Sequence, residues 1–90
     1  MNNFDFFYVT AHSTHKRKLL AVGIPANKIQ KHIEYSNRHR YPQVSYSATV
    51  SYFDVHNVGH QNARDNANGF VNDQPKLDGV NYYVGFHAAD

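Results

Sequence analysis

The feature that most constrains the fold is a long alternating stretch, QVSYSATVSYFDV, at residues 43–55. One alternating set is apolar or aromatic: Val44, Tyr46, Ala48, Val50 and Tyr52. The other set is small and polar: Gln43, Ser45, Ser47, Thr49 and Ser51. Because successive side chains of a strand point to opposite faces, the pattern predicts one strand with a core face and a hydroxyl-rich face. Typical strands run about 5–6 residues, so a strand this long is expected to bend, bulge or extend past its neighbours.

Two further segments, residues 4–11 and 79–88, also predict strands. In the first, large side chains occupy both alternating sets, with Phe6 and Tyr8 on one and Phe7 and Val9 on the other. This favours a central strand that is covered on both faces. In the second segment, one face carries Val80, Tyr82, Val84 and Phe86.

Helical patterns occupy the intervening sequence. Residues 14–22 and 26–37 predict two consecutive helices separated by Gly23 and Pro25, and residues 60–67 predict a short third helix. The expected architecture is one α+β domain over residues 1–90, with about three strands and the two helices packed on the sheet.

Charge is distributed unevenly along the chain. The net charge is +2, but residues 16–40 contain seven Lys and Arg against the single acid Glu34, whereas residues 41–90 carry a balance of −3. This asymmetry indicates an anionic partner for residues 15–40. The expected partner is nucleic acid, contacted mainly at its phosphates, or an acidic protein surface.

The candidate anion-binding residues follow from that asymmetry: Lys16, Arg17, Lys18, Asn27, Lys28, Lys31, Arg38 and Arg40. Three cations in the first turn of a helix oppose its dipole, a cost that a bound anion would relieve. An alternative is a helix-turn-helix around Gly23, whose second helix would present Asn27, Lys28, Gln30 and Lys31 to the DNA. A third interpretation is that these cations simply face solvent.

Catalysis and metal binding are weaker interpretations. The chain has no cysteine and a single glutamate, and nothing marks an activated nucleophile, so we expect a non-enzymatic protein without a cofactor. The pairs His12/His15 and His56/His60 have spacings that zinc sites use. The stretch His12-Ser13-Thr14 is similar to half of the motif of two-histidine phosphoesterases, but His56-Asn57-Val58 lacks the matching hydroxyl.

Protein docking is the main functional alternative. A small inhibitor or adaptor, of the kind that a phage or mobile element carries to block host nucleic-acid or defence machinery, would also suit this composition. Strand 43–55 has no Lys, Glu or Pro to protect an edge, so it either lies inside the sheet or pairs with another chain, for example as a homodimer. No signal peptide or membrane-spanning stretch is apparent, which predicts a cytoplasmic protein without a membrane partner.

Overall fold

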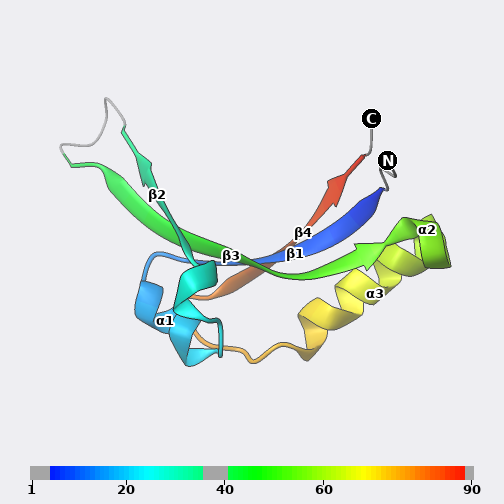
Figure 1. Ribbon diagram of the computed structural model, residues 1–90. Helices are drawn as coiled ribbons and strands as arrows, with labels where there is room; N and C mark the ends of the chain where they lie inside the picture. Colours follow the sequence, from blue (N-terminus) through cyan, green and yellow to red (C-terminus); the bar gives the residue numbers. More distant parts are fainter. Residues whose placement is uncertain (1–4, 36–40, 89–90) are drawn as a thin grey trace.

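The computed structural model describes residues 5–35 and 41–88, and within them four strands form one antiparallel sheet in the order β2-β3-β1-β4 (Figure 1). The strands are β1 (Phe6–Ser13), β2 (Gln30–Glu34), β3 (Gln43–Asp54) and β4 (Asn81–His87). The helices are α1 (Lys16–Ala21), the 3₁₀ turn η1 (Ala26–Lys28), α2 (Val55–Val58) and α3 (His60–Asp73). The predicted α+β class is confirmed.

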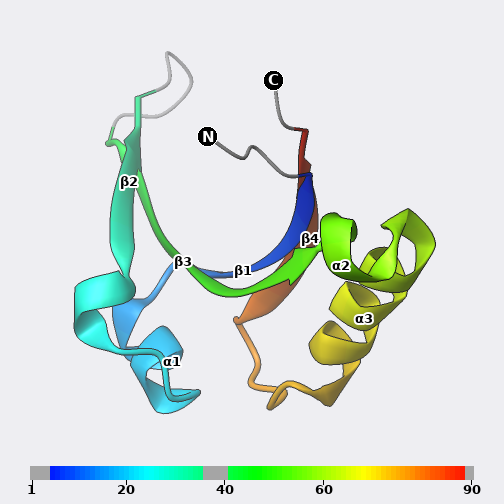
Figure 2. The same cartoon turned by 45° about the vertical axis from the view of Figure 1, so that its right-hand side comes forward.

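The described helices all lie on one face of the sheet. β1 and β2 run in the same direction with β3 between them, which is the split β-α-β topology, and α3 with β4 completes the second half. Figure 2 shows a strongly curved sheet with α1 and α3 on its outer, convex side. No described helix lies on the concave side. The central position expected for β1 is confirmed, whereas the expected cover on both of its faces is not found among the described residues.

The core follows the alternation of β1. Phe7, Val9, Ala11 and Ser13 are buried, and their neighbours along the strand are half-buried. Towards α3, Phe7 and Val9 pack against two alanines four residues apart, Ala63 and Ala67, whose small side chains let the helix approach the sheet closely. The short helix expected at 60–67 is therefore confirmed, and it extends to Asp73.

A second core cluster lies under α1. Leu19 is completely buried against Ala11 of β1 and Ala48 of β3, together with Ile24 from the loop that follows α1. The helix expected at 14–22 is present as Lys16–Ala21. Gly23 has a φ of 96°, a conformation that favours glycine and ends the helix as the sequence predicts.

The helix expected at 26–37 is wrong. Residues 26–28 form the single turn η1, and residues 30–34 form strand β2, which pairs with Gln43–Ser47 of β3. The apolar stripe that suggested a helix consisted of Ala26, Ile29 and Ile33, and Ile33 is 46% exposed. Pairing with β3 outweighs a stripe too narrow to bury a helix face. Without a second helix here, the helix-turn-helix interpretation loses its recognition element.

A β-bulge changes which residues of β3 face the core. Val9 of β1 is paired with Ser51, but the next residue, Thr10, is paired with Thr49, so Val50 is the extra residue. Beyond the bulge the alternation reverses. Tyr52, which the sequence pattern assigned to the core, is consequently 66% exposed on the concave face.

Candidate nucleic-acid interface

The concave face of the sheet gathers aromatic, imidazole and hydroxyl groups from four strands. Strand register places the following residues on it: Gln30, His32 and Glu34 of β2; Gln43, Ser45, Ser47, Thr49, Tyr52 and Asp54 of β3; Phe6, Tyr8, Thr10 and His12 of β1; and Asn81, Tyr83, Gly85 and His87 of β4. We call this set the concave face. Among the described residues it contains no Lys or Arg and two acids, Glu34 and Asp54.

Four rings form a row across the three neighbouring strands at one end of this face. The Phe6 ring stacks on His87 of β4, with centroids 4.8 Å apart and planes 24° apart. On its other side, Tyr52 of β3 meets Phe6 edge to face at 5.5 Å. Tyr8 is tilted against Phe6 at 6.2 Å. The result is a mixed aromatic platform rather than isolated surface rings.

Gly85 shapes this platform. A Cβ atom built at Gly85 would lie 2.3 Å from Cζ of Tyr8, so the Tyr8 ring lies directly over the glycine backbone. Because any larger residue at position 85 would displace that ring, the glycine allows Tyr8 to lie across β4 beside Phe6.

The other end of the concave face is polar. His32 Nε2 and Ser47 Oγ are 2.6 Å apart, which is hydrogen-bond distance. His12 is the β1 partner of Ser47, and its buried Nδ1 has no hydrogen-bond partner. The His12 ring also approaches Tyr83 at 6.2 Å. The polar end therefore offers hydrogen-bond donors and acceptors beside the ring of Tyr83, which is 55% exposed.

A cavity of about 320 Å³ adjoins the concave face where β2 begins. Its lining comes from η1, β2 and β3: Asn27, Lys28, Gln30, Ser47, Ala48, Thr49 and Tyr52. We call it the η1 cavity. β2 pairs only with Gln43–Ser47, so β3 continues beyond it with a free outer edge, and the cavity lies at this transition.

The predicted anion-binding residues do not form one surface. Asn27 and Lys28 line the η1 cavity. Lys31 is paired with Tyr46, on the helix side of β2, and Arg38 and Arg40 lie outside the described residues. The remaining three, Lys16, Arg17 and Lys18, lie on the convex side in α1.

The first turn of α1 contains three cations, as expected, but their side chains do not share one environment. It contains no acidic residue, and His15 at its N-cap makes no side-chain cap. Lys18 is half-buried, and its side chain packs over Gly79 in the turn before β4. A packing role for Lys18 separates it from the two exposed cations beside it.

The two members of each histidine pair lie in different elements of the fold. His12 lies on the concave face, whereas His15 occupies the N-cap position of α1 without a side-chain cap. His56 lies in α2, whereas His60 is the first residue of α3. The His60 side chain is exposed, and its ring lies 5.1 and 5.3 Å from those of Phe7 and Phe86, measured between centroids. The described residues contain no group of three or more His, Asp or Glu side chains placed to hold a metal ion.

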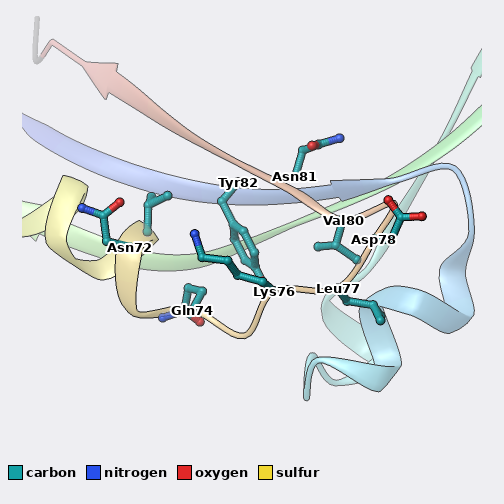
Figure 3. A pocket seen from close by; sticks show the side chains of 9 residues that line it. Asn72, Gln74, Lys76, Leu77, Asp78, Val80, Asn81 and Tyr82 are labelled. Carbon is teal, nitrogen blue, oxygen red and sulfur yellow. The ribbon is translucent and has the colours of Figure 1, made fainter.

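A second cavity, of about 350 Å³, lies on the helix side between the end of α3, the following linker and the start of β4 (Figure 3). Its lining mixes apolar side chains such as Val71 and Leu77 with polar ones such as Asn72 and Lys76. Tyr82 extends into it and donates a hydrogen bond from its hydroxyl to the Pro75 carbonyl, at 3.3 Å. Burial raises the pKa of this Tyr82 hydroxyl. The sequence of the linker, residues 74–80, predicts turns and did not predict this cavity.

Comparison with protein-family models, curated proteins and solved structures finds no match to this chain. Within residues 5–35 and 41–88, no helix has the length and apolar character needed to cross a membrane. Any functional conclusion therefore rests on the geometry of the concave face and the cavity beside it.

Proposed function

We propose that this protein binds single-stranded nucleic acid on the concave face of its sheet. The observation that carries the proposal is the row of rings on adjacent strands, formed by Tyr52, Phe6, Tyr8 and His87, on a face that no described helix covers. The nucleic-acid partner expected from the sequence is retained, but the contact surface moves from the helical cations to the sheet.

Stacking is the physical basis of this proposal. Every base has a π-face, and stacking on a protein ring contributes about 1–3 kcal/mol per base irrespective of sequence. Four-stranded sheets with exposed aromatic residues on neighbouring strands can stack two or three bases of RNA in this way. In a duplex the base faces are already stacked on one another, so single strands are the preferred partner.

The η1 cavity supplies polar contacts next to the rings. Lys28 offers a cation for a phosphate, and the amides of Asn27 and Gln30 can pair with base edges. Its volume of about 320 Å³ is at the lower end for small-ligand pockets, about 300–1,000 Å³, and therefore suits a single nucleotide. Tyr52 lines this cavity and belongs to the aromatic row, so a single nucleic-acid strand can contact both the cavity and the row.

Fluorescence anisotropy with labelled single-stranded RNA, single-stranded DNA and duplex DNA tests the proposal across a range of salt concentrations. We expect single strands to bind at least about tenfold more tightly than the duplex, because only they expose base faces to the rings. Equal affinity for duplex and single strands would indicate that the cations of α1, rather than the rings, make the contact with nucleic acid. Absence of binding at low salt would overturn the proposal and favour docking onto a protein.

Replacing Lys28 with alanine should weaken single-strand binding and reduce its salt dependence. Each phosphate contact that is lost should lower the slope of log K against log salt by about 0.7 for a single strand. Lys31→Ala is the matched control, because Lys31 lies three residues away on the helix side of β2. Equal effects of the two variants would show that the η1 cavity is not where phosphate binds.

A further inference from the structure

β4 is an edge strand that lacks the usual protection against pairing with another chain. It is the last strand in the sheet order, so its outer backbone groups have no partner strand among the described residues. Its sequence, NYYVGFH, contains no Lys, Arg, Asp, Glu or Pro. Exposed edges are normally protected by such residues, by a bulge or by very short strands. The pairing of β4 with β1 runs without a register shift over its whole length.

The opposite edge of the sheet differs in these respects. β2 is shorter and carries Lys31 and Glu34. β4, by contrast, exposes three large side chains, Tyr83 (55%), Val84 (36%) and Phe86 (43%). Ile33 is the one large apolar side chain that is exposed among the described residues of β2, so β4 is the more apolar edge.

We infer that β4 pairs with β4 of a second copy to form a symmetric antiparallel dimer with one continuous sheet. Directly opposed residues of an antiparallel pair share a face, so a symmetric pairing must place one residue opposite itself. Centring on Val84 is the register that pairs all of Asn81–His87. The helices of both copies then lie on the same side of the sheet.

The side chains of β4 are complementary to themselves in this register. On the helix side, Val84 meets its own copy, and Tyr82 meets Phe86 twice, which forms a continuous apolar row. On the concave side, Tyr83 of each copy lies opposite Gly85 of the other, next to the Tyr8 ring that covers this glycine. The uncharged strand brings no like charges together, and it offers no charge that would favour an acidic or basic peptide as its partner. A second copy is thus the occupant that this edge fits best.

Sedimentation velocity over a range of protein concentrations tests the inference, without nucleic acid, on the wild-type chain. We expect the sedimenting mass to rise with concentration from that of one copy to that of two and no further. The reason is that pairing covers the β4 edge of each copy. A monomer at all concentrations would overturn the inference, as would growth beyond two copies.

The variant Val84→Lys should weaken the dimer at least about tenfold, since it places two ammonium groups directly opposite each other. Val58→Lys in α2 is the matched control, because Val58 is similarly exposed, at 43%, but belongs to a helix and not to the β4 edge. Hydrogen exchange of wild-type β4 amides should also slow as concentration rises, a readout that does not depend on the variant's folding. Concentration-independent exchange would contradict the dimer even if Val84→Lys failed to fold.

Discussion

Replacing Tyr52 with leucine should weaken single-strand binding about 5- to 150-fold, with little change in the midpoint of thermal unfolding. The reason is that a base stacked on one ring contributes about 1–3 kcal/mol, and each 1.4 kcal/mol corresponds to a factor of ten. Tyr52 is 66% exposed, so the fold gains little from burying it. Of the rings in the aromatic row it is also the one that lines the η1 cavity. Anisotropy titrations at one fixed salt concentration give the ratio of dissociation constants directly.

Tyr52→Phe provides the control at the same position. Phenylalanine keeps the ring and the edge contact with Phe6 but removes the hydroxyl, so affinity should stay within about threefold of wild type. A loss in both variants would assign the effect to the hydroxyl rather than to stacking. Unchanged affinity in Tyr52→Leu would mean that nucleic acid, if bound, does not use the aromatic row.

The bulge in β3 explains why this candidate site could not be read from the sequence. Strict alternation over residues 43–55 correctly predicts a long strand, and it places Ala48 in the core, where it is 3% exposed. The same alternation also places Tyr52 there, because nothing in the local sequence marks Val50 as an extra residue. The bulge depends on the register between β1 and β3, which is a tertiary property. One inserted residue thus places a tyrosine that the sequence assigns to the core in the aromatic row, where it is 66% exposed.

Strand β2 shows a different limit of sequence reasoning. Its residues, QKHIE, have the polar character of a surface helix, and only pairing with β3 distinguishes the two states. Of the four residues expected on a recognition helix, Asn27, Lys28 and Gln30 line the η1 cavity, and Lys31 does not. They converge there because η1 and the start of β2 bend around the free edge of β3, whereas a helix would have carried Lys31 with them.

The largest expected effect on stability comes from Leu19→Ala. Leu19 is fully buried between Ala11, Ala48 and Ile24, and alanine would leave a cavity that small neighbours cannot fill. Such substitutions cost about 2–5 kcal/mol, a large share of the about 5–15 kcal/mol that stabilises a typical domain. Urea unfolding monitored by circular dichroism should therefore show a clearly lower midpoint with an unchanged slope.

Leu20→Ala is the control, because Leu20 is the next residue of the same helix and is 44% exposed. Its free energy of unfolding should stay within about 0.5 kcal/mol of wild type. Equal losses at both positions would mean that α1 packs through a different face than Leu19. The pair also separates stability from binding, because α1 lies on the convex side of the sheet. Where Leu19→Ala remains folded, its affinity for single strands should match wild type, and a parallel loss of binding would place α1 and its cations back in the binding surface.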